Sequence, residues 1–369
     1  HADGEYFAPL QPFGARINGT TNTDRTNYYE TVPSNVLERA LWMEADRMGF
    51  LLPALTQAKL DNQRDVVRNE RRQNYEIAPY AKSRQAIVEA LWPSSHPYHR
   101  LTIGSHEDLE AANLDDVRNF FNTWYVPNNA TLVVVGDIDV AKTKAWVQRF
   151  FGPIPRGPQP APITEAKAER PKATTITLED NVQLPRVYYV WQSAPFLKDG
   201  DADLDVLSLV LSNGKTSRLH KRLVFDDHIA KDVYAGQWSS QLGSSYYVVA
   251  TAAPGHTPAQ LQAAIDDELQ KLLSEGPTNE EVERAINGWR KSFYGSIESV
   301  AGKAGLLQRY NHYLGDPNWV QKDLERYLAI TPASVQDWAK KTLMPEHRVT
   351  VIVNPKAAET KHAAQGVAK

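Results

Sequence analysis

The sequence predicts an α+β protein made of two homologous lobes, each with a mostly antiparallel sheet covered by helices. Its 369 residues correspond to about two domains of ordinary size. A proline-rich segment divides the chain near its middle. The stretches before and after that segment end in the same order of amphipathic helix, proline and β-branched run, and such a mixture of helices and strands is typical of the α+β class.

Composition excludes several classes of protein. Hydrophobic residues make up 42% of the chain and charged residues 23%, which is ordinary for a globular protein. The formal net charge of -3 does not favour nucleic acid as a partner. Cysteine is absent, so disulfides, thiolate metal ligands and a cysteine nucleophile are excluded. No apolar run is long enough to predict a membrane span.

The proline-rich segment covers residues 152–171 and is predicted to be an extended linker. Six prolines lie in it, at positions 153, 155, 158, 160, 162 and 171. Proline fixes φ and removes an N–H donor, so neither a helix nor a central strand runs through such a stretch. We therefore expect lobes at 1–151 and 172–354, with a flexible tail at 355–369.

The two lobes look like copies at a constant offset. Val117 and Val335 are 218 residues apart, as are Pro127 and Pro345. Several matches at one offset indicate a duplication. The second lobe opens near Thr174, whose counterpart falls at 174 − 218 = −44, ahead of His1. We expect the start of the first lobe to lie outside this sequence; a first lobe that is simply shorter is the alternative.

Local patterns predict the individual elements. A Thr- and Tyr-rich stretch at 14–30 indicates two strands joined by a turn near 22–24. A helix is expected to begin at Ser34 with that serine as its N-cap. Further helices are predicted at 56–76, 83–91, 114–124, 201–211, 216–224, 258–273, 278–296, 299–314 and 333–342. Further strands are predicted at 131–135, 187–192, 233–240, 245–253 and 349–353.

Common catalytic motifs are missing from the sequence. It contains no GxxxxGK[ST] loop, no GxGxxG opening a helix and no GxSxG elbow. The zinc motifs HExxH and HxxEH are also absent. His96 and His99 form a close pair, but Pro97 between them argues against one helical face, so we interpret them as part of a loop.

Three segments together resemble the pitrilysin/insulinase superfamily of zinc metallopeptidases. They are DVVRNERRQNYE at 65–76, NGTTNTDRTNYY at 18–29 and WYVPNNATLVVVGD at 124–137. The second-lobe segment SRLHKRL at 217–223 adds to the resemblance. It implies a clamshell of two α+β lobes, one half-unit of an enzyme that hydrolyses peptides in an enclosed chamber.

The resemblance implies zinc as the cofactor. In that family two His of an HxxEH helix and a Glu of a later helix bind the metal, and the Glu within HxxEH is the general base. Glu70 matches the later ligand. The HxxEH motif precedes a segment like Gly4–Phe7, so here it falls outside the sequence. We expect no catalytic residue and an incomplete zinc site in this chain. The alternative for Glu70 is an exposed helix carboxylate among arginines.

The resemblance also suggests substrate-binding residues. A peptide would add as a strand beside Asn18, Gly19, Thr20 and Thr21; an ordinary hairpin is the alternative. In the second lobe Arg222 matches a family arginine near the catalytic centre, and a surface charge is the alternative. Lys231 stands where the family has a tyrosine, which puts that contribution in doubt.

Two functions therefore remain open. One is a zinc metalloendopeptidase that acts on peptides or unfolded polypeptides, with this chain inactive alone. The other is a non-catalytic partner subunit that binds peptide or completes a heteromeric peptidase. A homodimer or a heteromeric partner is expected in either case, because an incomplete first lobe exposes part of its core. Periplasmic location is suggested only by the family.

Overall fold

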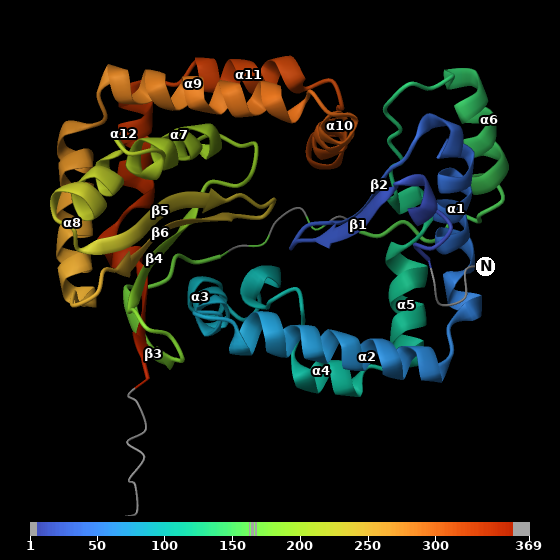
Figure 1. Ribbon diagram of the computed structural model, residues 1–369, viewed down its shortest axis with the longest axis horizontal. Coiled ribbons are helices and arrows are strands. Elements are labelled where there is room, and N and C mark those ends of the chain that lie inside the picture. Colours follow the sequence, from blue (N-terminus) through green and yellow to red (C-terminus); the bar gives the residue numbers. More distant parts are fainter. Residues whose placement is uncertain (1–5, 162, 164–165, 167, 357–369) are drawn as a thin grey trace, which may run out of the picture.

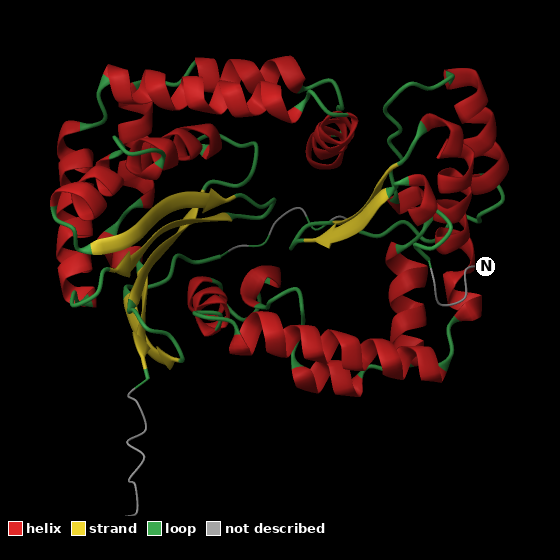
Figure 2. Ribbon diagram, viewed as in Figure 1, coloured by secondary structure: helices red, strands yellow, loops and turns green. Residues whose placement is uncertain are grey.

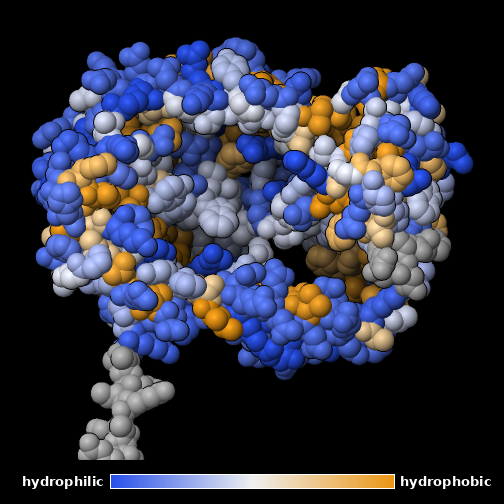
Figure 3. Space-filling model, viewed as in Figure 1, coloured by the Kyte–Doolittle hydropathy of each residue, from blue (hydrophilic) through white to orange (hydrophobic). Residues whose placement is uncertain are grey.

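The computed structural model describes residues 6–161, 163, 166 and 168–356. Its elements surround a central hollow, which the space-filling view shows (Figure 3), and Figure 1 shows their arrangement. A large sheet with its helices forms one side, and a hairpin with helices forms the other. In the part of the chain described, no helix combines the length and apolarity needed to cross a bilayer.

The first lobe holds one hairpin and six helices among its described residues. Its elements are β1 (Arg16–Thr21), β2 (Thr26–Thr31), α1 (Leu37–Ala54), α2 (Gln57–Arg71), α3 (Lys82–Leu91), α4 (His106–Ala111), α5 (Leu114–Trp124) and α6 (Val140–Phe151). A π-helical turn, Arg72–Ile77, extends α2. The predicted strands at 14–30 and the helices at 56–76, 83–91 and 114–124 are confirmed, while α4 and α6 were not predicted.

The second lobe contains a five-stranded sheet. Its elements are β3 (Thr174–Asp180), β4 (Arg186–Ser193), α7 (Asp201–Ser212), β5 (Ala230–Trp238), β6 (Ser244–Ala252), α8 (Pro258–Glu275), α9 (Asn279–Ser296), α10 (Val300–Leu314), α11 (Val320–Leu328), α12 (Pro332–Thr342) and β7 (Val349–Pro355). The strand order is β3-β7-β4-β6-β5, and only the β3–β7 pair is parallel. The prediction of a mostly antiparallel sheet covered by helices is confirmed for this lobe (Figure 2).

Strand register confirms that the lobes are copies. In the first hairpin Arg16 pairs with Thr31. Adding 218 to each gives Tyr234 and Val249, which pair in the β5–β6 hairpin. The helices α5 and α12 also agree residue for residue at this offset, and both begin with a capping box. β1 is therefore the counterpart of β5, which is an edge strand of the large sheet.

Two predicted details are wrong. Ser34 is not a helix cap, because residues Ser34–Val36 form a 3-10 turn without a side-chain cap before α1 begins. The run Thr131–Val135 is not a strand, although its counterpart β7 lies in the middle of the large sheet. The two strands that flank β7 are β3 and β4. At the same offset their counterparts fall ahead of residue 1, so this run has no partner among the described residues. The first lobe thus has a two-stranded sheet.

The cores of the two lobes differ in size. The second lobe has a large apolar core that includes Val335 and Ala339 of α12, both fully buried. Their counterparts on α5, Val117 and Phe121, are only partly buried. The main first-lobe cluster comprises Leu10, Val36, Ala40 and Met43. The expected exposure of the first lobe follows from the same missing strands, because no described strand pairs with residues 131–135 and α5 is only partly covered.

The lobes exchange one helix each. The first-lobe helix α3 packs on β3, β4 and β7 of the second lobe, and its counterpart α10 packs against β2 of the first. Figure 1 shows α3 beside the large sheet and α10 above the hairpin. Between the lobes, residues 152–173 form no helix or strand where they are described. Of the predicted tail, only its first two residues are described, and Pro355 belongs to β7.

Candidate functional site

Glu70 lies near the C-terminal end of α2 and is exposed to solvent. The helix begins at its N-cap Thr56, whose side chain accepts a hydrogen bond from Lys59 N. The helix has few aliphatic residues, so most of its surface is polar. Glu70 makes no hydrogen bond or ion pair with another described residue, whereas the arginines next to it do.

Those arginines hold α2 against α4 and the segments beside it. Arg64 donates to the carbonyl of Ala112 at 2.7 Å, and Arg68 forms an ion pair with Glu110 at 2.5 Å. Arg71 donates to the carbonyl of Gly104 at 2.6 Å. These residues are spaced four and three positions apart, so they share one face of the helix. Glu70 is therefore left free while the neighbouring cations are used for packing.

A second contact fixes the end of the helix. The carboxylate oxygen Oε1 of Glu76 lies 2.9 Å from His106 Nε2, from which it accepts a hydrogen bond, and 3.3 Å from Arg71 Nε. Its carboxylate thus joins the π-helical turn to the start of α4. The helix end that carries Glu70 is thus held by side chains of α2 and the turn after it, whose partners lie 30 to 48 residues further along the chain.

The described residues do not by themselves form a metal site. Nowhere in the described part of the chain do three His, Asp or Glu side chains gather in a way that could hold a metal ion. Glu70 offers one carboxylate, whereas catalytic zinc needs about three protein ligands. The described donor set does not fit zinc, and the assignment of Glu70 as a ligand stays a prediction.

The predicted substrate strand has a free edge. Asn18 to Thr21 lie on β1 and are exposed, and β1 pairs only with β2 in the described structure. The turn closes with Asn22 N donating to Arg25 O, so alternation directs the backbone groups of Gly19 away from β2. The side chain of Asn18 accepts a hydrogen bond from Gly19 N at 2.8 Å. An incoming peptide would replace that bond.

Gly19 itself is required by close packing. A Cβ there would lie 3.1 Å from Tyr28 Cδ1 and 3.2 Å from Asn27 O. Two contacts hold Tyr28: the guanidinium of Arg47 lies over its ring at 3.7 Å, and its hydroxyl is hydrogen-bonded to that of Tyr125 at 3.0 Å. Burial is the main reason that the pKa of Tyr28 is raised above its ordinary value.

A cluster of acids lies beneath this hairpin. Glu44 of α1 accepts a hydrogen bond from Tyr6 at 2.5 Å and pairs with Arg47 at 2.5 Å. Glu30 of β2 lies beside Glu44. Burial first, and the Glu44 charge second, raise the pKa of Glu30 from 4.5 to about 7. The cluster fixes β2 on α1 and so fixes the strand that presents β1.

Arg222 is not brought to the hairpin or to α2. It lies in the π-helical turn His220–Asp226, and its guanidinium contacts Asp227 at 3.2 Å, Glu268 at 3.8 Å and also Asp267. Two of these acids belong to α8, which covers the outer side of the large sheet in Figure 1. The geometry supports a surface charge at Arg222. Lys231 is exposed at a bulge in β5.

The tips of the two hairpins meet at Asp24, which the sequence did not single out. Its carboxylate accepts hydrogen bonds from Gln241 N at 2.9 Å, from Tyr313 at 3.3 Å and from Tyr98. Tyr98 also accepts a bond from Leu242 N at 3.0 Å. In the loop His96–His99 the tyrosine reaches the joint, while His96 accepts a hydrogen bond from Tyr98 N and stacks on Trp92. No sequence signal indicated this joint.

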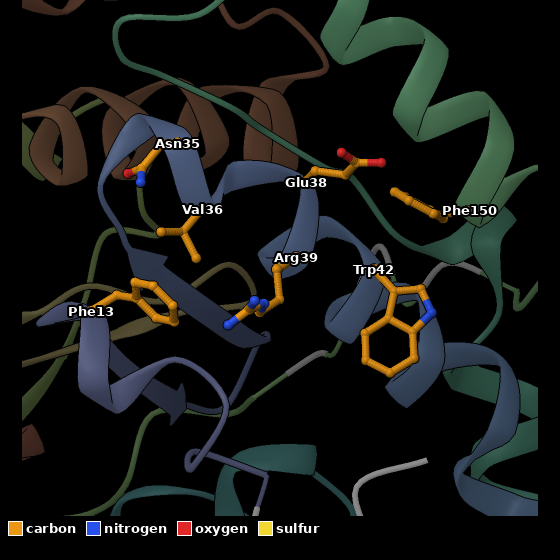
Figure 4. Close-up of a pocket in the computed structure, with 7 residues that line it drawn as sticks. All are labelled: Phe13, Asn35, Val36, Glu38, Arg39, Trp42 and Phe150. Carbon is orange, nitrogen blue, oxygen red and sulfur yellow. The ribbon is translucent and has the colours of Figure 1, made fainter.

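One pocket of the first lobe lies away from all the predicted residues. It has a volume of about 390 Å³ and is lined by Phe13, Asn35, Val36, Glu38, Arg39, Trp42 and Phe150. Figure 4 shows Arg39 between Phe13 and Trp42, with Phe150 of α6 at one side. Most of the exposed large apolar side chains of the protein belong to the first lobe, Trp42 among them. This pocket is part of that uncovered apolar surface.

Comparison with known proteins identifies the class. A family model described as "Peptidase M16 inactive domain" matches residues 111–288. A zinc protease of Helicobacter pylori, PqqE, is 26% identical over 310 residues, which are 83% of this chain and 69% of the relative. An uncharacterized zinc protease of Bacillus subtilis, YmxG, is 23% identical over 346 residues, covering 92% of this chain and 81% of the relative.

Solved structures agree with the fold. A protease from Helicobacter pylori has a TM-score of 0.88 at 25% identity, over 95% of this chain and 85% of the other. A Pseudomonas fluorescens structure described as a peptidase M16 inactive domain has a TM-score of 0.84 at 18% identity, over 96% and 84%. Two duplicated α+β lobes around a hollow are the architecture of an M16 peptidase half. This chain is therefore similar, in sequence and in fold, to proteins of the pitrilysin/insulinase (M16) superfamily.

Proposed function

We propose that this chain is the peptide-binding body of a zinc metalloendopeptidase of the pitrilysin/insulinase type. The observation that carries the proposal is the free carboxylate of Glu70, at the position where the family motif has a metal ligand. A helix surface rich in arginine would ordinarily neutralise such a carboxylate, yet Arg64, Arg68 and Arg71 are bonded elsewhere. Glu70 is therefore available to an ion or to a further segment of protein.

The uncovered first lobe supports the same proposal. Residues 131–135 have the sequence of a central strand but pair with no strand in the described part of the chain, and α5 is less covered than α12. A segment that repeats β3, β4 and α7 would supply both. In the family the HxxEH helix occupies the corresponding place, so one segment would complete the core and bring the two histidine ligands toward Glu70.

The free edge of β1 supports a peptide as the substrate. Main-chain pairing with an edge strand recognises an extended peptide without selecting strongly for its side chains. Gly19 and Thr21 are small enough to leave room beside the strand. The central hollow in Figure 3 gives such a peptide a place to lie.

A non-catalytic partner is the second candidate function. It is favoured by one relative, a Helicobacter pylori protein named "Non-peptidase homolog YmxG", which is 24% identical over 259 residues, 66% of this chain and 56% of the relative. Such a partner would use the same free strand edge to bind peptide and would need no metal.

The test uses the protein expressed from its complete gene. We expect it to hold zinc, measured by elemental analysis, and to cleave an internally quenched peptide. Glu70→Gln should lower zinc content and hydrolysis about tenfold or more, because it removes one of about three ligands, while the far-ultraviolet circular dichroism stays unchanged.

Asp65→Asn is the matched control, since Asp65 is another exposed carboxylate on α2; it should leave zinc and activity in place. Full zinc binding and hydrolysis in the Glu70→Gln variant would rule out the ligand assignment. A complete gene without an HxxEH motif, together with peptide binding and no hydrolysis, would establish the partner function instead.

A further inference from the structure

A second pocket lies where α3 meets the open face of the large sheet. Its volume is about 390 Å³ and its lining comes from both lobes. The segment Pro79–Ala81 and Arg84 come from the first lobe, while Arg186, Tyr188, Asp232 and Tyr234 come from the second. Figure 1 shows α3 beside this sheet at the border of the central hollow.

The guanidinium of Arg186 is held in one orientation. It lies over the ring of Tyr80 at 3.8 Å, and its Nε donates to Thr251 Oγ1 at 2.8 Å. Thr251 is buried and donates in turn to Asp232 at 2.7 Å. Of the terminal nitrogens, Nη1 makes only a long contact of 3.5 Å with the Tyr188 hydroxyl. The two terminal nitrogens of the guanidinium are thus held in place, and among the described residues they make only this one long contact.

The tyrosine beneath it is held in an unusual backbone conformation. Tyr80 has φ 62, a left-handed value that is uncommon for a bulky residue and persists only where the surroundings impose it. The surroundings here are the carboxylate of Asp180, which accepts from Tyr80 N at 2.8 Å, and the carbonyl of Leu184, which accepts from the hydroxyl at 2.9 Å. Strain of this kind is found where a side chain must be placed accurately.

Neither arginine of the pocket has a carboxylate partner. Within the described residues no acid lies within ion-pair distance of Arg186 or Arg84. Arg348 provides a comparison, because it also lies over a tyrosine ring at 3.8 Å, that of Tyr189, but is paired with Asp266 at 2.6 Å. The pocket therefore holds two unpaired cations against one acid, Asp232, which already accepts a hydrogen bond from Thr251.

We propose that this pocket binds a carboxylate of the peptide that occupies the hollow, with Arg186 as a two-pronged donor and Arg84 as a second positive charge. The inference rests on the proposed function, since it names a group of the same substrate. A carboxylate matches the fork of an oriented guanidinium better than any other peptide group. The rings of Tyr80, Tyr188 and Tyr234 give the adjoining side chain an apolar wall.

The test is equilibrium binding of fluorescent peptides, measured by anisotropy with no need for hydrolysis. Three peptides of one sequence are compared: the free acid, its C-terminal amide, and a version with internal Asp and Glu replaced by Asn and Gln. The lost carboxylate should weaken binding about tenfold or more, since charge-assisted pairs are the stronger ones. If the C-terminal amide binds more weakly, the pocket binds the terminal carboxylate. If the Asn/Gln version binds more weakly, it binds a side-chain carboxylate.

Variants assign the effect to the pocket. Arg186→Met should bind the free acid and the modified peptides with equal, weak affinity, and Arg186→Lys should restore only part of the difference. Arg348→Met removes an arginine stacked at the same distance outside the pocket and should leave the preference intact; thermal unfolding of each variant checks the fold. If all three peptides bind equally to the unaltered protein, this inference is wrong and peptide binding stands. If none binds, both proposals fail.

Discussion

A buried acid pair in the second lobe makes its stability depend on pH. Asp201 and Asp205 lie one turn apart on α7, and Asp201 is fully buried. Asp201 is paired with Arg326 at 3.3 Å, while Asp205 accepts a hydrogen bond from Tyr327 at 2.6 Å. Burial first, and the charge of Asp201 second, raise the pKa of Asp205 from 3.8 to about 7. Asp205→Asn removes the titration and keeps an acceptor for Tyr327.

The size of the effect follows from the two pKa values. A shift from 3.8 to about 7 corresponds to roughly 4 kcal/mol, at about 1.4 kcal/mol for each unit. Between these pH values the folded state keeps a proton that the unfolded state releases, so stability falls as the pH rises. The contribution is fully present below the unfolded pKa and is lost as the pH passes the folded pKa.

The assay is urea unfolding of the unaltered protein and of Asp205→Asn, at about pH 5 and about pH 8. When the pH is raised from about 5 to about 8, the free energy of unfolding of the variant should increase by roughly 3 kcal/mol relative to that of the unaltered protein. Asp203→Asn is the control, because Asp203 precedes Asp205 on α7 and has no hydrogen bond or ion pair with a described residue. A difference between the unaltered protein and Asp205→Asn that does not change with pH would refute this account of the pair.

Two further expectations concern the first hairpin. Asp24→Ala removes the acceptor of Tyr98, Tyr313 and Gln241 N. Loss of such bonds to a charged group should lower the free energy of unfolding by about 3 kcal/mol. Amide hydrogen exchange should also become faster at both hairpin tips, and unchanged exchange there would show that the joint does not depend on this carboxylate. Gly19→Val raises β-propensity but places Cβ 3.1 Å from the Tyr28 ring, so urea unfolding should show a loss of about 1–3 kcal/mol, and a gain would mean that propensity outweighs packing.

Much of the fold could be predicted because the duplication is readable in the sequence. Each half ends in the same helix-proline-strand order, so one offset transfers the elements of one lobe to the other. The N-caps Asn113 and Thr331 show why, since both close a capping box at the start of matching helices. Local patterns of this kind depend on residues close together in the chain.

The failures at residues 131–135 and on α5 have one physical origin. The strand pattern at 131–135 is as clear as that of β7, but a strand forms only where partners lie on its edges. The prediction treated the pattern as sufficient. The same reasoning explains the partly exposed Val117 and Phe121, whose positions on α12 are buried by a complete sheet. A local sequence pattern indicates which element a segment can form, and the segments packed beside it determine whether that element forms.

The sequence predicted only those parts of the candidate site that lie within a single continuous motif. Glu70 and the strand at 18–21 lie within continuous segments, whereas the Asp24 joint and the Arg186 pocket combine residues from opposite lobes. Tyr80 and Arg186 are separated in sequence by the helices α3 to α6, the linker and β3, and they meet because α3 crosses to the second-lobe sheet while α10 crosses back to β2. Each lobe supplies a helix to the other, and both proposed binding features adjoin this exchange, because α10 contacts β2, the partner strand of β1, and α3 borders the Arg186 pocket.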